Sequence, residues 1–176
     1  DGEYLMIYGP SPLRYATSSD LMKWQAKGML DEGKQPGRDP SLLFFEGTYY
    51  LVTCDRGAIC LSTSQDRQTW DYQGEILGMA EGVDPESPTL VRAHGTFYHF
   101  VCGWNGIWDK KELAGAYQHV TWVYQSQEPD RFDGDRVLTK LNAHAPEIFQ
   151  DQEGNWYISS VEYPVRGVSI ARLVWE

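Results

Sequence analysis

Short runs of aromatic and β-branched residues alternate with polar turns along the whole chain. Four of these runs begin directly after a glycine, and the glycines lie 45, 48 and 59 residues apart. Runs of this composition, bounded by turn residues, are typical of β-strands. No stretch repeats its apolar residues with the period of an amphipathic helix, so we expect an all-β protein. The four glycines are Gly2, Gly47, Gly95 and Gly154.

A second signature follows the first three of these glycines. It is a polar turn that contains a serine and an acid and ends on an aromatic residue. The turn begins 17 residues after Gly2 and Gly47 but 31 residues after Gly95, which predicts an insertion between residues 103 and 118. We expect the aromatic residue to close the space between two strands. The three segments are 19–24, 64–70 and 126–132.

A third signature, a proline with a carboxylate beside it, precedes three of the glycines. The prolines lie seven, seven and eight residues before them. Proline fixes φ and suits the first residue of a strand better than its middle. We therefore expect each repeat unit to open with a strand that carries an acid at its start. The acids and their prolines are Asp39 with Pro40, Glu86 with Pro88, and Glu147 with Pro146.

Three signatures in one order, with about four short strands per unit, predict an all-β fold of β-propeller blades, each a four-stranded antiparallel sheet. A β-sandwich is the structural alternative, but it does not require signatures in register. We treat the chain as a single propeller domain. It divides into a partial blade, a complete blade, a blade with the insertion and a final blade. These blades cover residues 1–31, 32–80, 81–140 and 141–176.

The propeller arrangement predicts a shared pocket. The first strand of each blade lines the central channel, so equivalent ends of these strands converge at one mouth. Asp39, Glu86 and Glu147 hold nearly equivalent places and are expected to face one another there. Carboxylates gathered in this way raise one another's pKa, which suits acid and base chemistry. Asp84 competes with Glu86 for a place in the pocket, but the spacing from Pro88 favours Glu86.

Composition narrows the choice of partners. The formal net charge of −10 argues against nucleic acid and against an anionic membrane, since phosphate binding needs Lys and Arg. No run approaches the ~20 apolar residues of a membrane span. An acidic chain with 14% aromatic residues suits a neutral polar ligand. We find no phosphate-binding loop, Ser-His-Asp set or metal cluster, so we expect no cofactor and no metal.

The three cysteines cannot all pair with one another, and none forms a CxxC motif. This argues against a disulfide scaffold and against a zinc site. Cys54 and Cys60 flank a predicted hairpin turn, and we expect them to be small core residues. A disulfide between Cys54 and Cys60 is the alternative.

The motifs together resemble the five-bladed β-propeller glycosidases of glycoside hydrolase families 43 and 32. The resemblance covers nearly the whole chain and rests on the order and spacing of the motifs. Ser19-Asp20-Leu21-x-x-Trp24 and the final stretch 167–175 fit the same pattern. The opening motifs of three blades carry most of it: Arg38-Asp39-Pro40, Glu86-Ser87-Pro88 and His144-Ala145-Pro146-Glu147-Ile148.

The resemblance implies two catalytic roles. The family uses three carboxylates, of which Asp39 matches the one that orients the sugar and tunes the acid. Glu86 matches the one that donates a proton to the leaving group. The remaining carboxylate, a nucleophile or base, belongs before the strand that follows Gly2 and falls outside this sequence. About three and a half blades are present against five in the family. We therefore expect a fragment, a propeller completed by a second copy in a homodimer, or a protein that has lost catalysis.

Five further residues are candidates for carbohydrate binding. Arg38 suits a clamp on a sugar hydroxyl, and His144 and Glu147 open the final blade at the same mouth. Trp104 and Trp108 lie in the glycine-rich insertion, where indole rings are platforms for sugar rings. Two functions follow: acid-assisted cleavage of a furanoside or plant-type oligosaccharide, or carbohydrate binding without turnover.

Overall fold

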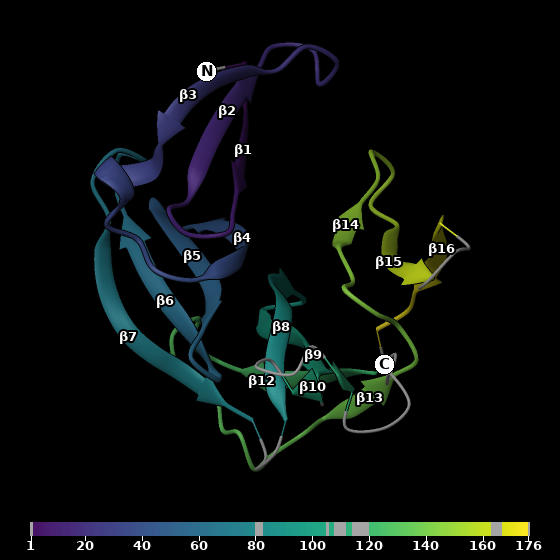
Figure 1. The fold of residues 1–176 in the computed structure, drawn as a ribbon. Helices are drawn as coiled ribbons and strands as arrows, with labels where there is room; N and C mark the ends of the chain where they lie inside the picture. The colour runs from purple at the N-terminus through teal and green to yellow at the C-terminus, as the bar shows by residue number, and fades with distance from the viewer. Residues whose placement is uncertain are drawn as a thin grey trace.

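The computed structural model describes residues 2–79, 83–104, 106–107, 112–113, 120–162 and 167–175. Its strands form four antiparallel sheets of three or four strands that follow one another in chain order, with a small separate hairpin. Figure 1 shows these sheets arranged around a common centre, with the strands β1, β4, β8 and β14 innermost. The all-β propeller architecture expected from the sequence is confirmed.

The strands of the second sheet are longer than those of the first. The first sheet has the order β1 (Tyr4–Tyr8), β2 (Arg14–Ser18) and β3 (Gln25–Met29). A single 3-10 turn, η1 (Leu30–Gly33), leads out of it. The second sheet then runs outward from the centre in the order β4 (Arg38–Phe45), β5 (Thr48–Asp55), β6 (Ala58–Ser64) and β7 (Asp71–Gly78).

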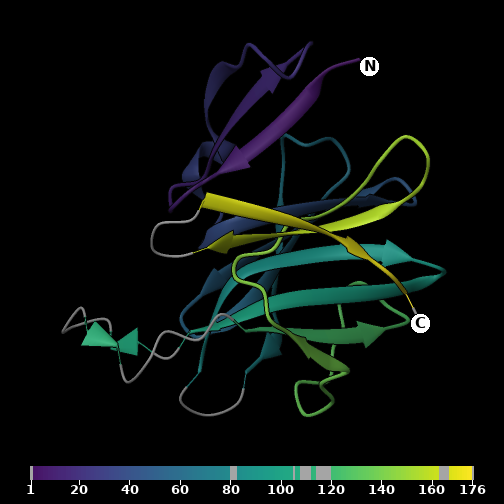
Figure 2. The same cartoon turned by 90° about the vertical axis from the view of Figure 1, so that its right-hand side faces the viewer.

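The last two sheets repeat this plan with one interruption. The third sheet runs outward through β8 (Asp84–Ala93), β9 (Thr96–Trp104), β12 (Thr121–Ser126) and β13 (Thr139–Leu141). A hairpin of β10 (Gly106–Ile107) and β11 (Glu112–Leu113) lies within the predicted insertion. The fourth sheet has the order β14 (Ile148–Gln150), β15 (Trp156–Glu162) and β16 (Gly167–Leu173). Figure 2 shows the hairpin projecting away from the sheets.

The glycine turns have the geometry that tight hairpins require. Glu46 and Gly47 have φ of 48° and 82°, and His94 and Gly95 have φ of 50° and 86°. Positive φ at both central residues matches the twist of the flanking strands, and glycine adopts it without steric cost. These turns join β4 to β5 and β8 to β9, so they set the register of both inner strand pairs.

Apolar side chains fill the spaces between neighbouring sheets. Figure 1 shows these spaces side-on, and each holds a separate cluster of buried residues. Leu13 and Leu51 meet between the first and second sheets, and Leu61 and Phe97 between the second and third. Phe100 and Ile148 lie in the cluster between the third and fourth sheets. Burial of these faces is the main force that holds the sheets around the centre.

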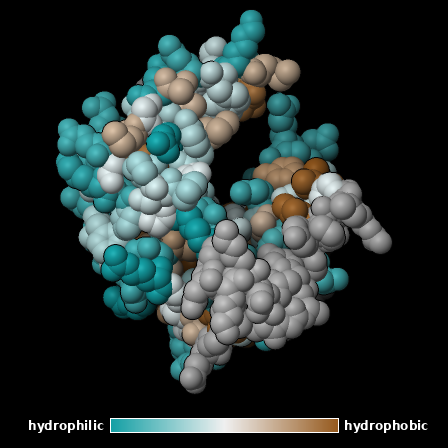
Figure 3. Space-filling view, in the orientation of Figure 1, coloured by the Kyte–Doolittle hydropathy of each residue, from teal (hydrophilic) through white to brown (hydrophobic). Residues whose placement is uncertain are grey.

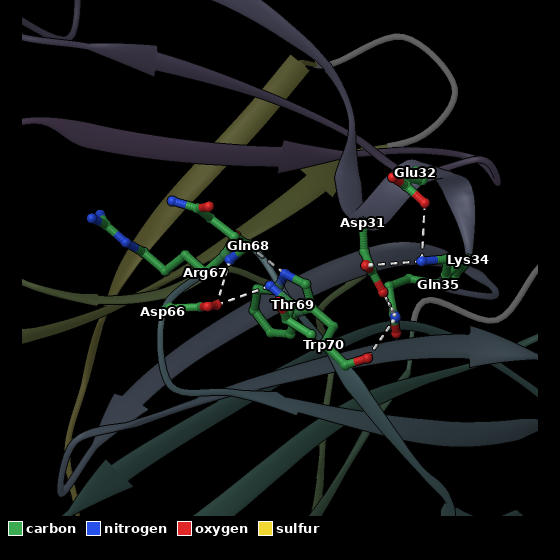
Figure 4. Close-up of polar contacts among 9 residues, drawn as sticks. All are labelled: Asp31, Glu32, Lys34, Gln35, Asp66, Arg67, Gln68, Thr69 and Trp70. Carbon is green, nitrogen blue, oxygen red and sulfur yellow. Dashed lines mark hydrogen bonds and ion pairs between the residues drawn. The ribbon is translucent and has the colours of Figure 1, made fainter.

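The segment 30–37, which connects the first sheet to the second, is held by polar contacts to the second sheet, as Figure 4 shows. Gln35 is buried, and its side-chain nitrogen donates to Asp31 Oδ2 at 2.7 Å and to the carbonyl of Trp70 at 3.2 Å. Its oxygen accepts a hydrogen bond from Ser62 Oγ at 2.6 Å. Because a buried amide without partners is costly, these bonds favour one path for the connecting segment.

The serine-and-acid turn closes in the way the sequence predicts. Asp66 Oδ1 accepts hydrogen bonds from the backbone N–H groups of Gln68 and Thr69, at 2.8 and 2.9 Å. Trp70 Nε1 donates to the carbonyl of Arg67 at 3.3 Å, and its ring is buried against the second sheet (Figure 4). These backbone bonds lower the pKa of Asp66.

Within the described part of the chain, no helix is long and apolar enough to cross a membrane. All three cysteines are buried and none is in a disulfide, so the core role expected for Cys54 and Cys60 is confirmed.

Candidate functional site

Each of the last three sheets opens with a strained residue before a proline. Asp39, Ser87 and Ala145 have φ of 53°, 45° and 47°. Positive φ is uncommon for residues other than glycine, and a following proline restricts the backbone further. In β4 and β8 the ladder register shifts at these residues, which is the mark of a β-bulge. Strained bulges of this kind concentrate at functional sites, where they redirect side chains.

The bulges correct one expectation from the sequence. The cross-strand partner of Arg38 is Cys54, and that of Glu86 is Cys102. The carbonyl of His144 accepts a hydrogen bond from the N–H of Val161 at 2.8 Å, which places His144 at the same level in the fourth sheet. Arg38, Glu86 and His144 are therefore the equivalent residues.

The expectation that Asp39, Glu86 and Glu147 hold equivalent positions is wrong for a local reason. Asp39 stands one residue before its proline, Glu86 stands two before, and Glu147 follows its proline. The residue with positive φ is the one preceding the proline, so Asp39 lies at this residue, Glu86 lies before it and Glu147 lies after it. The spacing of each acid from its proline does not reveal this difference, because the backbone changes direction within two residues at the bulge.

Arg38 nevertheless brings two of the predicted acids together. Its Nη1 forms an ion pair with Asp39 Oδ2 and lies 3.6 Å from Glu86 Oε1. Its Nη2 donates to the carbonyl of Pro85 at 3.3 Å. Asp39 Oδ2 also accepts a hydrogen bond from the N–H of Ser87 at 3.2 Å. Arg38 and Asp39 belong to β4 and Glu86 to β8, so this cluster bridges the second and third sheets.

Arg38, Asp39 and Ser87 of this cluster form part of the wall of a pocket of about 500 Å³ at the centre of the molecule, whereas Glu86 is not one of its lining residues. All four sheets or their connections contribute to it, and Figure 3 shows the molecule hollowed there. Pockets of roughly 300–1,000 Å³ are typical of small-molecule sites. The lining residues are Ile7, Tyr8, Gly9, Pro10, Arg38, Asp39, Pro40, Ser87, Pro88, Ala145 and Glu147.

Glu147 lines the same pocket from the fourth sheet. Its N–H donates to Ser159 Oγ at 2.9 Å, and its carbonyl accepts from the N–H of Ser159 at 3.0 Å, so the backbone is held on both sides. The residue is exposed on the pocket wall. Desolvation by the protein atoms around it nevertheless raises the pKa of its carboxyl group.

His144 lies behind the pocket wall and is not one of its lining residues. Its Nδ1 is 3.2 Å from Cys102 Sγ, and that sulfur accepts a hydrogen bond from the N–H of Ala145 at 3.2 Å. The N–H of His144 donates to Ser160 Oγ at 3.0 Å. These contacts tie the third bulge to β9 of the neighbouring sheet.

The structure does not test the two predicted tryptophan platforms, because it does not describe the side chain of Trp104. Trp104 ends β9, where its backbone pairs with Asp84, and Trp108 lies outside the described residues. The structure instead supplies wall residues that the sequence did not single out, Ile7, Tyr8 and Pro10. Tyr8 was detectable as the last aromatic residue of a predicted strand. Among the residues the structure describes, no group of three or more His, Cys, Asp or Glu is arranged to hold a metal ion.

Comparison with known proteins finds similarity in the fold but none in the sequence. No protein-family model and no curated protein matches the chain. Solved structures do match. A GH43 protein of the Bacteroides ovatus xyloglucan PUL superposes with a TM-score of 0.73 at 18% identity, covering 100% of this chain and 39% of the other.

Two further structures have the same fold. An exo-β-1,3-galactanase from Clostridium thermocellum matches with a TM-score of 0.67 at 16% identity, covering 97% of this chain and 38% of that one. A GH32 β-fructofuranosidase from Bombyx mori matches with a TM-score of 0.65 at 17% identity, covering 90% and 40%. The chain thus spans about 40% of the length of these proteins, and its fold is that of the GH43 and GH32 propellers, as expected.

Proposed function

We propose that the chain carries the substrate site of a glycoside hydrolase that cleaves a furanoside or a plant-type oligosaccharide. One observation carries the proposal: Arg38 contacts Asp39 of its own sheet and Glu86 of the next, beside a pocket of about 500 Å³. Arg38 and Asp39 on the pocket wall supply hydrogen-bonding groups for sugar hydroxyls, and Glu86, next to the lining residue Ser87, is the candidate proton donor. The fold shared with a β-fructofuranosidase and a galactanase supports the same class of chemistry.

The proposed reaction divides the work among these residues. Glu86 gives its proton to the glycosidic oxygen as the bond between that oxygen and the anomeric carbon breaks, and the sugar passes through an oxocarbenium-like state. Asp39 accepts hydrogen bonds from sugar hydroxyls, and Arg38 holds Asp39 in place. The nucleophile or base comes from a carboxylate outside these residues. Glu147 binds a hydroxyl on the opposite side of the pocket.

A second candidate is carbohydrate binding without turnover, and one contact favours it. Arg38 Nη1 lies 3.6 Å from Glu86 Oε1, and a guanidinium this close favours the charged form of a carboxylate, which has no proton to donate. Under this alternative Arg38, Asp39, Glu86 and Glu147 form the polar wall of a binding site. His144, Trp104 and Trp108 would keep the binding roles predicted for them.

A third arrangement is an enzyme completed by a second copy of the chain. Exposed apolar residues on β1, Tyr4 and Met6, and on β16, Val168 and Ile170, favour association of these sheets with another surface. In such a homodimer the partner would supply the remaining carboxylate. Activity would then follow the dimer fraction measured by light scattering over a range of concentrations.

The test is turnover of nitrophenyl furanosides and pyranosides by the parent chain and by Glu86→Gln. We expect the substitution to lower kcat at least about 100-fold, the scale of general acid catalysis, while sugar binding measured by calorimetry persists. The control is Glu128→Gln, which removes the charge of an exposed glutamate paired with Arg131 and should leave kcat unchanged.

Three outcomes separate the candidates. Turnover that Glu86→Gln abolishes supports the hydrolase. Sugar binding by the parent chain with no turnover of any glycoside supports the binding protein and rejects the hydrolase. Equal kcat in the parent and Glu86→Gln rejects Glu86 as the proton donor.

A further inference from the structure

Side chains of the third sheet hold the segment 143–147, which leads into the fourth sheet. Thr121 Oγ1 in β12 donates a hydrogen bond to the carbonyl of Ala143 at 2.8 Å. Thr89 Oγ1 in β8 donates to the carbonyl of Pro146 at 2.7 Å. Both threonines are buried, so loss of either bond would leave a hydroxyl and a carbonyl unsatisfied inside the protein. These bonds therefore favour one position of the segment against the third sheet.

Cys102 in β9 supplies a third contact between these two bonds. Its Sγ accepts a hydrogen bond from the N–H of Ala145 at 3.2 Å and lies 3.2 Å from His144 Nδ1. Cys102 is fully buried, and burial raises the pKa of its thiol, so the sulfur keeps its proton and carries no charge. It thus bonds, as a neutral group, the strained residue itself, since Ala145 has φ of 47°.

The same bond is made at the preceding bulge by a residue of the candidate site. There the N–H of Ser87 donates to Asp39 Oδ2 at 3.2 Å. Ser87 and Ala145 each stand before the proline of their sheet, and both line the pocket of about 500 Å³. In both cases the acceptor belongs to the sheet that comes earlier in the chain. Cys102 therefore holds the bulge of the fourth sheet as Asp39 holds that of the third.

The position of Glu147 relative to Asp39 depends on these bonds between sheets. Glu147 lies two residues after Ala145 and lines the same pocket as Asp39. Its own backbone bonds go to Ser159, which belongs to β15 of the fourth sheet. Bonds within one sheet move with that sheet, so they do not fix the separation of Glu147 from Asp39. Contacts from the third sheet, such as that of Cys102, do fix it.

We propose that Cys102 is a positioning residue for Glu147: its sulfur holds the bulge at Ala145 against the third sheet and so sets where the Glu147 carboxylate meets a sugar hydroxyl. The inference rests on the sugar-binding role proposed for Glu147. Cys102 itself touches no substrate, because it is fully buried and does not line the pocket.

The test compares three substitutions of Cys102. Cys102→Val and Cys102→Ala remove the acceptor, one with added bulk and one without, whereas Cys102→Ser keeps it. In the first two, KM for a nitrophenyl glycoside and the calorimetric Kd for the free sugar should rise about tenfold, the loss of one well-placed hydrogen bond. In Cys102→Ser both should stay within about threefold of the parent, because the hydroxyl accepts from the same N–H.

The value of kcat separates positioning from general damage to the strand. Cys102 is the cross-strand partner of Glu86, so a disturbed β9 would displace the proton donor and lower kcat. We expect kcat in all three variants to stay within about twofold of the parent, because the lost bond serves substrate binding. The matched control is Cys60→Val, which removes a buried thiol that accepts from Tyr72 and should change neither KM nor kcat.

A double variant tests whether Cys102 acts through Glu147. Glu147→Gln alone should weaken sugar binding, and adding Cys102→Val should weaken it little further, because the two substitutions disturb one contact. Losses that multiply in the double variant would overturn the proposal. So would equal weakening by Cys102→Ser and Cys102→Val, since the serine keeps the acceptor.

A measurement without any sugar keeps this proposal separate from the proposed function. Desolvation raises the pKa of Glu147, and a bulge released from the third sheet would admit water to the carboxyl group. NMR titration should therefore show the pKa of Glu147 nearer its ordinary value in Cys102→Val than in the parent or Cys102→Ser. This shift in a chain that binds no sugar supports the bulge contact and rejects the hydrolase and the binding protein. An unchanged pKa in Cys102→Val rejects the positioning role.

Discussion

At the residue scale, the site depends on positive φ at three residues, which residue type alone does not predict. Asp39 is one of the residue types that tolerate positive φ, but Ser87 and Ala145 are not. The sequence shows the prolines and predicts where the strands begin. It does not show that a bulge precedes each proline, because the bulge is imposed by how each inner strand pairs with its neighbour. Arg38 and Glu86 therefore meet in a way that spacing alone did not predict.

His99 gives a prediction at this scale. It is fully buried between the second and third sheets, beside Phe132 and opposite Tyr124. Its ring nitrogens find no hydrogen-bond partner within the described residues. Burial lowers the pKa of His99 to about 3, against about 6.5 in the unfolded chain. Protonation therefore favours unfolding, and the stability that the neutral ring secures is complete above pH 6.5 and is lost as the pH falls toward 3.

The measurement is the free energy of unfolding in urea between pH 7 and pH 4. Stability of the parent should fall with decreasing pH by up to about 1.4 kcal/mol per unit from this one residue, and His99→Leu should remove that slope. His94→Asn is the control, since His94 is exposed in a turn and asparagine accepts its positive φ. An identical slope in the parent and His99→Leu would show that His99 does not titrate in this way.

At the scale of elements, the glycine turns and the serine-and-acid turns were predictable because both are local. Gly47 and Gly95 form the tight turns that the sequence indicates. The turns that hold Trp24 and Trp70 have the same hydrogen bond from the indole Nε1 to the carbonyl three residues earlier. What the sequence does not show is which aromatic residue is covered. Trp70 is only 4% exposed, because a neighbouring sheet lies over it, whereas Trp24 is partly exposed.

This difference gives a prediction with its own control. Trp70→Ala should lower the free energy of unfolding by about 3–5 kcal/mol, the usual cost of emptying a buried aromatic site. Trp24→Ala should cost clearly less, because part of its ring is already in contact with water. Urea unfolding followed by circular dichroism measures both variants. Equal losses would mean that the cluster of Leu13, Leu30, Leu51 and Trp70 does not hold the first two sheets together.

At the scale of the whole molecule, repetition predicted the propeller architecture, and solved structures with 16–18% identity confirm it. The pocket was beyond sequence reasoning, because part of its wall is the connection Gly9-Pro10, which belongs to no repeated motif. Substrate positions can therefore be proposed only from the assembled arc of sheets.

The most direct test of the account is a crystal structure of Glu86→Gln with a neutral disaccharide bound. We expect one sugar ring within hydrogen-bond distance of Asp39, in the pocket that Asp39 and Glu147 line, and the glycosidic oxygen next to residue 86. A disaccharide bound outside this pocket, or one whose glycosidic oxygen lies away from residue 86, would contradict the account.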